Sequence, residues 1–138
     1  MHSSIPMPPV WSIQHSLREY EKPFAAANRR EGGGELLPLS DEDVSDLTNA
    51  IVSFWAMVHQ KGMAYEAFKE KVVISYTGGD ERGAKYAFRC LFWKTLKRFV
   101  TRDGSDEDDV VIYELENLAW MFFKSHVLDV VKASGRRS

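Results

Sequence analysis

Residues 40–62 read SDEDVSDLTNAIVSFWAMVHQKG and give the clearest helix signal in the chain. Ser40 is a favourable N-cap, and the three acids after it lie where the positive end of a helix dipole favours negative charge. Gly62 is a suitable stop. Between them, apolar residues recur at helical spacing and polar residues occupy the opposite face. The pattern predicts an amphipathic helix that buries Val44, Leu47, Ile51, Phe54, Trp55 and Val58.

Three further helices are predicted after this one. They cover Met63–Tyr76, residues 81–101, and a long segment that runs from Ser105 as its cap to Lys132. Two β-branched runs, at 72–76 and 110–113, leave open a short two-stranded pairing. The residues that flank both runs are helix formers, so helix is the preferred interpretation. The prediction is an all-α protein, a small helical bundle of about four main helices.

The first 39 residues differ in character from the rest of the chain. Three prolines within the first ten residues predict an extended start. A short helix is expected over Trp11–Lys22, and Pro23 ends it or opens a second helical turn. Gly32–Gly34 predicts a joint with high backbone entropy. The predicted organisation is therefore an N-terminal helical arm at 1–39, a helical bundle core at 40–133 and a frayed tail at 134–138.

Charge reverses sharply along the second half of the chain. Residues 82–102 hold seven cations and no acid, whereas residues 103–116 hold seven acids and no base. The formal net charge is only -2, so opposite charges are segregated rather than in excess. Segregated charge creates surface potential, and surface potential selects partners.

The basic helix at 81–101 is the predicted partner-binding element. Its cations neutralise phosphates or carboxylates of a partner, and Tyr86 or Trp93 stacks on bases if that partner is a nucleic acid. An ordinary solvated face, part of it paired with the acids at 103–109, stays open as an alternative. So does a helix-turn-helix that begins at Met63. The candidate partner-binding residues are Arg82, Lys85, Arg89, Lys94, Lys97 and Arg98.

A second candidate surface is apolar. On the last helix Met121 and Leu128 fall on the polar face at seven-residue spacing, beside Trp120. Such a pair marks a protein contact or the seam of a homodimer. The three residues are therefore a candidate apolar contact.

The motifs expected of enzymes and metalloproteins are missing from the sequence. The four histidines form no HExxH or HxH pattern, and the acids at 103–114 do not follow the calcium-loop spacing. Cys90 is the only cysteine and is expected to be a buried small hydrophobe. We therefore predict no catalytic residue, no metal and no cofactor. A secretory signal and a membrane-spanning run are also missing, which predicts a cytoplasmic protein with no membrane partner.

Together these features predict a non-enzymatic interaction protein. It would act as an adaptor, regulator or inhibitor, for example the phage or mobile-element type of inhibitor of a nucleic-acid-processing machine. A protein is the first partner expected, docked through the basic helix. The alternative is a DNA- or RNA-binding protein that uses the same helix, 81–101.

Overall fold

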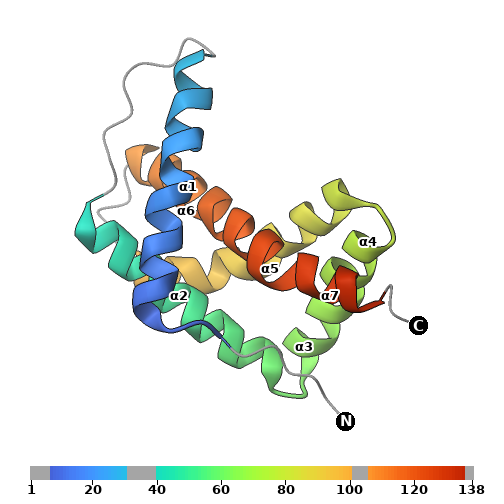
Figure 1. Cartoon of the computed structure of the whole chain (residues 1–138). Coiled ribbons are helices and arrows are strands. Elements are labelled where there is room, and N and C mark those ends of the chain that lie inside the picture. The colour runs from blue at the N-terminus through green and yellow to red at the C-terminus, as the bar shows by residue number, and fades with distance from the viewer. Residues whose placement is uncertain (1–6, 31–39, 101–105, 136–138) are drawn as a thin grey trace.

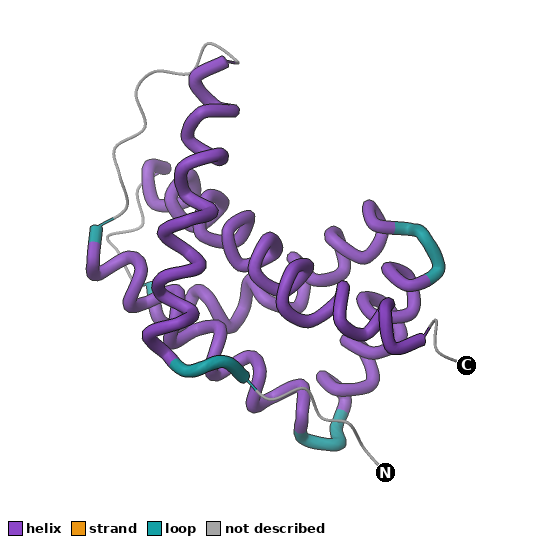
Figure 2. The backbone as a smooth tube through the Cα atoms, in the orientation of Figure 1, coloured by secondary structure: helices purple, strands orange, loops and turns teal. Residues whose placement is uncertain are grey.

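The computed structural model describes residues 7–30, 40–100 and 106–135 (Figure 1). This part of the chain is helical apart from short connections and contains no strand, which confirms the all-α prediction (Figure 2). Two of the helices continue through π-helical turns, labelled η, so that the described residues form five rods. The elements are α1 (Val10–Arg30), α2 (Asp41–His59), α3 (Met63–Ala67), η1 (Phe68–Val73), α4 (Ile74–Thr77), α5 (Glu81–Phe99), α6 (Asp106–Phe123), η2 (Lys124–Leu128) and α7 (Asp129–Gly135).

Helix α2 begins where its sequence predicts. The Ser40 side-chain oxygen accepts a hydrogen bond from the Asp43 backbone N–H at 3.0 Å, which satisfies one of the unpaired donors of the first turn. The predicted apolar face is buried, except that Trp55 is half-buried. Local capping and helical periodicity therefore account for this element.

The turn between α4 and α5, and the first turn of α5 itself, each depend on a glycine. Gly79 has a φ of 93°, in the left-handed region that favours glycine, and it reverses the chain after α4. Asp80 then caps α5, because its side chain accepts a hydrogen bond from the Gly83 backbone N–H at 2.9 Å. A Cβ atom at Gly83 would lie 2.2 Å from an Asp80 carboxylate oxygen, so a larger residue there would displace the cap. The predicted start of this helix is confirmed.

The strand pairing left open by the sequence is wrong. Residues 72–76 lie in η1 and α4, and residues 110–113 lie in α6, all in helical geometry. Val72 and Ile112 are both buried in the helical core. The β-branched runs are therefore accommodated as packing surface within helices, and their flanks decide the local structure.

Helix α1 runs through Pro23 without a break, so the predicted division at this proline is wrong. Proline removes one backbone hydrogen bond from a helix interior, and packing of the preceding turns offsets that loss. Ile13 and Leu17 are fully buried where α1 contacts α6 and α2, and Arg18 pairs with Asp41 at the start of α2 at 2.7 Å. Figure 1 shows α1 lying across the bundle. The predicted glycine joint lies outside the described residues.

Aromatic rings fill the centre of the bundle. Phe54 of α2 is fully buried and makes edge-to-face contacts with four phenylalanine rings, at centroid distances of 5.3 to 5.8 Å. Edge-to-face pairs stabilise a core beyond the burial of their area. The four rings come from η1, α5 and α6 and belong to Phe68, Phe88, Phe92 and Phe123.

Among the helices that the structure describes, none combines the length and apolar character that a membrane crossing requires.

Candidate functional site

All six predicted partner-binding cations lie on α5 and are exposed. Helical geometry divides them into two groups. Arg82, Lys85 and Arg89 follow one face of the N-terminal half, at i, i+3 and i+7, and the other three lie on the C-terminal half. No ion pair involves these six among the side chains that the structure describes. The acids at 103–109 lie outside those side chains, so their predicted pairing with the basic helix stays a prediction.

Aromatic rings hold two of these cations in place. The Arg89 guanidinium lies over the Tyr113 ring of α6 at 5.0 Å and over the Trp93 ring at 5.7 Å. The Lys97 ammonium lies over the same Trp93 ring at 5.5 Å. We call Tyr113, Arg89, Trp93 and Lys97 the cation–aromatic ladder. Stacking on a ring leaves the edges of a guanidinium free to donate hydrogen bonds, so the ladder orients Arg89 without neutralising it.

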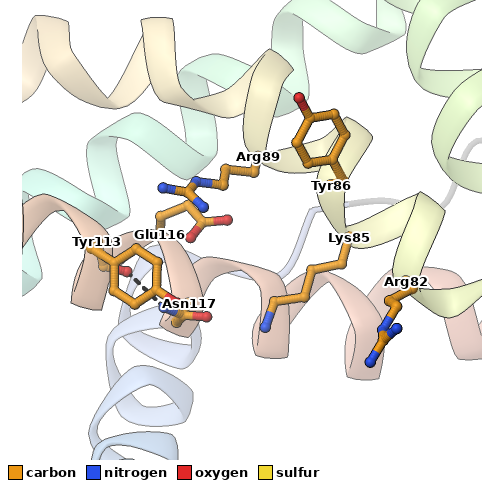
Figure 3. Close-up of a pocket in the computed structure, with 7 residues that line it drawn as sticks. All are labelled: Arg82, Lys85, Tyr86, Arg89, Tyr113, Glu116 and Asn117. Atoms are coloured by element: carbon orange, nitrogen blue, oxygen red, sulfur yellow. Dashed lines mark hydrogen bonds between the residues drawn. The ribbon is translucent and has the colours of Figure 1, made fainter.

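A cavity of about 160 Å³ opens beside this ladder, between α5 and α6 (Figure 3). The two helices run antiparallel here, because Glu81 at the start of α5 pairs with Lys124 just after α6, while Arg89 lies over Tyr113. Each helix contributes residues at i, i+3 and i+4, which share one face. The lining residues are Arg82, Lys85, Tyr86, Arg89, Tyr113, Glu116 and Asn117.

Glu116 is the unusual member of this lining. Its exposed fraction is only 1%, and its Oε1 atom has no hydrogen-bond partner among the described residues. Burial raises the pKa of this carboxyl group, and the nearby charges of Arg89 and Lys85 oppose that rise. Buried carboxylates are normally paired or hydrogen-bonded, so this unpaired oxygen is an unfavourable feature of the packing between α5 and α6.

Asn117 lies next to Glu116 and is also buried, with an exposed fraction of 8%. Its amide nitrogen donates a hydrogen bond to the Tyr113 backbone oxygen at 2.9 Å. That bond fixes the orientation of the amide, and its oxygen is the end turned away from the bond (Figure 3). The lining therefore combines two buried polar residues of α6, Glu116 and Asn117, with three exposed cations of α5.

The predicted apolar contact surface is wrong in two of its three residues. Trp120 and Leu128 are buried, with exposed fractions of 4% and 0%, and Met121 is half-buried. Trp120 packs against Phe88 and Tyr76. The reason is that α6 is contacted by α1, α2 and α5, so a helix that is apolar nearly all round is covered on several sides.

Cys90 also differs from its prediction, because it is exposed. The apolar run around it indicated burial, but its neighbours one turn away, Tyr86 and Lys94, are exposed as well. Cys90 is exposed because it lies on the solvent-facing side of α5, whatever the apolar character of its neighbours in sequence.

Sequence reasoning singled out three of the lining residues as cations and missed the acceptors opposite them. Glu116 was visible only as one acid in an acidic stretch. One signal was present: Tyr113, Glu116 and Asn117 stand at i, i+3 and i+4, in a segment whose other residues are Glu114, Leu115, Leu118 and Ala119. Side chains at that spacing lie on one face of a helix.

No protein family, curated protein or solved structure matches this chain.

Proposed function

We propose that the protein is a non-enzymatic interaction protein that docks on an acidic macromolecular partner through the exposed cations of α5. The observation that carries the proposal is the exposure of all six cations of this one helix. Complementary charge steers association and selects the partner more than it adds affinity. An acidic surface of another protein is the first partner we propose, in a cytoplasmic setting, where an adaptor, regulator or inhibitor of a nucleic-acid-processing machine would act.

Charge reversal on α5 tests this proposal. The tagged full-length protein is compared with the double variant Arg89→Glu and Lys97→Glu in pull-downs from native lysate, with mass measurement of the complex. A matched control carries Lys61→Glu and Lys71→Glu, two exposed cations outside α5, so that the net charge changes equally. Circular dichroism establishes that both variants are folded. We expect the α5 variant to lose a complex that the control retains. Equal capture by both variants would exclude α5 as the docking surface.

Direct binding of DNA or RNA by α5 is the second candidate. The cation–aromatic ladder and Tyr86, whose exposed fraction is 70%, favour it, because exposed rings among cations are the usual platform for single-stranded bases. Affinity for an oligonucleotide should then fall steeply as salt increases, since each phosphate contact releases counterions. Mobility-shift measurements at low and high salt distinguish the two candidates.

A further inference from the structure

Glu116 lies at the contact between α6 and α5, the helix that carries the proposed docking surface. It lines the same cavity as three exposed cations of that helix, Arg82, Lys85 and Arg89 (Figure 3). Its exposed fraction is 1%, and its Oε1 atom has no hydrogen-bond partner within the described residues. A carboxyl group so covered is not available to a partner for direct contact, so a partner on α5 acts on it only through charge.

The positive charges that act on Glu116 come from α5. Burial raises the pKa of this carboxyl group, whereas Arg89 and Lys85 lower it. Neither cation forms a direct ion pair with Glu116 among the side chains that the structure describes, so both favour the ionised carboxylate from a distance. Because the carboxyl group is withdrawn from water, this interaction is screened less than one between two exposed charges. The other titratable groups of the cavity lining belong to Arg82, Tyr86 and Tyr113.

The other elements that pack against α6 carry charges that face a different side of it. Burial, then Asp43 of α2 and Glu21 of α1, raise the pKa of Glu114. Glu114 precedes Glu116 by two positions, which places the two side chains about 200° apart around the helix axis. In η2 the first titratable residue, Lys124, lies about 12 Å along the rod from Glu116 by helical rise. The charge state of Glu116 is therefore tied to α5 rather than to α1, α2 or η2.

An acidic partner on α5 would change the electrostatic field at Glu116. Its negative groups would pair with Arg89 and Lys85, two of the exposed cations of the proposed docking surface. The positive charges that favour the ionised carboxylate would then be neutralised, and new negative charge would lie close to it. A carboxyl group beside a like charge binds its proton more tightly. Docking on α5 would therefore favour the protonated form of Glu116, although the partner never touches it.

We propose that docking of an acidic partner on α5 is coupled to uptake of a proton by Glu116, so that the protein binds this partner more tightly as the pH falls. The inference rests on the proposed function and describes its regulation. Coupling of two binding events is reciprocal, so protonation raises the affinity for the partner by the factor by which the partner raises the affinity for the proton. The gain is absent above the pKa of Glu116 in the complex and complete below its pKa in the free protein. Since burial already raises the latter above 4.5, exposed carboxylates of the partner keep their charge within this window.

Titration of Glu116 in the purified full-length protein tests the coupling. NMR spectroscopy of the side-chain carboxyl carbon follows the titration, and Glu116→Gln identifies the signal by its loss. We expect the titration midpoint to rise in the double variant Lys85→Gln and Arg89→Gln, which removes both charges. The matched control Lys61→Gln and Lys71→Gln, at exposed positions outside α5, should leave the midpoint unchanged. An unchanged midpoint in the α5 variant would overturn the inference.

Arg89→Lys separates the effect of charge from the effect of packing. It keeps the positive charge but gives up the guanidinium that lies over the Tyr113 ring. The midpoint of Glu116 should therefore stay near its value in the wild type. A rise as large as that in Arg89→Gln would assign the effect to lost packing and would contradict coupling through charge. Circular dichroism establishes that each variant is folded.

A synthetic polyaspartate peptide serves as the acidic probe for the docked state. With the peptide present, the midpoint of Glu116 should rise, and calorimetry in buffers of different ionisation enthalpy should detect proton uptake that Glu116→Gln reduces. An unchanged midpoint would overturn the inference, whether the peptide fails to bind or its charge fails to reach Glu116.

The pull-down with charge-reversed α5 reports on docking alone, so the two proposals can fail separately. Loss of the complex there, together with an unchanged midpoint, would keep the docking surface and remove the proton coupling. Equal capture there, together with a midpoint that rises with the peptide, would keep the coupling and remove the native partner from α5.

Discussion

Tyr76 of α4 donates a hydrogen bond from its phenol to the carboxylate of Asp129, the first residue of α7, 53 positions later in the chain. Tyr76 is buried, with an exposed fraction of 6%, whereas Asp129 is exposed. Burial, and then the Asp129 carboxylate, raise the pKa of the phenol to about 12. The contact connects the two parts of the fold that contain π-helical turns.

Tyr76→Phe removes this contact and should destabilise the protein. Because the acceptor is charged and lies at the surface, the expected loss is about 1 to 2 kcal/mol of unfolding free energy. Urea denaturation of the wild type, Tyr76→Phe, Asp129→Ala and the double variant measures it. The phenol effect should shrink in the Asp129→Ala background, and strict additivity would show that the two groups do not interact.

Tyr76 should also make the unfolding free energy depend on pH in the alkaline range. The folded-state pKa of about 12 lies above the ordinary value of 10.0, so the folded state holds this proton more tightly than the unfolded state. Its contribution is therefore complete below about pH 10 and is lost as the pH rises through about 12. Between about pH 10 and 12 the unfolding free energy should therefore decline less in Tyr76→Phe than in the wild type, as urea denaturation at each pH would show.

Glu116→Gln is expected to stabilise the protein at neutral pH. The pKa of Glu116 is raised above its ordinary value of 4.5, so its contribution to stability is present at pH below that value and is lost as the pH rises through the folded-state pKa. The uncharged variant should unfold at a higher temperature than the wild type near neutral pH, and the difference should shrink toward about pH 4. Glu70→Gln, at an exposed position of η1, is the matched control. A gain that is the same at both pH values would contradict the titration of Glu116.

Loss of the Phe54 ring should lower the unfolding free energy more than loss of any surface contact. Phe54→Ala removes a fully buried ring that contacts four others, and the expected loss is about 3 to 5 kcal/mol. Phe54→Leu keeps most of the volume and should lose less. Chemical denaturation of both variants checks the order, and equal losses would mean that aromatic geometry rather than volume decides the stability.

The Lys124–Glu81 ion pair should contribute little, although its 2.5 Å separation is short. Both side chains are about half exposed, at 42% and 51%, and solvent screens such pairs. Lys124→Ala should therefore change the unfolding free energy by less than about 1 kcal/mol. A loss several times larger, measured by denaturation, would show that this pair rather than the core holds α5 against η2.

Much of the fold could be predicted because its signals are local. The cap at Ser40, the glycine turn before Asp80 and the helical spacing of apolar residues fix where α2 and α5 begin and which faces they bury. The failures have a tertiary cause. Pro23 is carried inside α1 while the helix is held by packing at Ile13 and Leu17, and the burial of Leu128 depends on which helices cover the end of the long rod.

In the candidate site, too, features set by local sequence could be predicted, and features set by tertiary packing could not. The exposure of the α5 cations could be predicted, because lysine and arginine side chains are rarely buried unless they are paired. The burial of Glu116 could not, since it depends on the packing of α5 against α6. Acidic residues close together in sequence have different environments according to the helix face on which they lie.

The exposure of Cys90, the only cysteine in the chain, has a practical consequence. A thiol-reactive fluorophore or spin label would attach at a single defined position, directly after Arg89 on the helix that lines the cavity. Occupancy of this region could then be followed as a change in emission or in label mobility, with the natural sequence unaltered. The residue expected to be hidden thus provides a built-in reporter of whatever approaches α5.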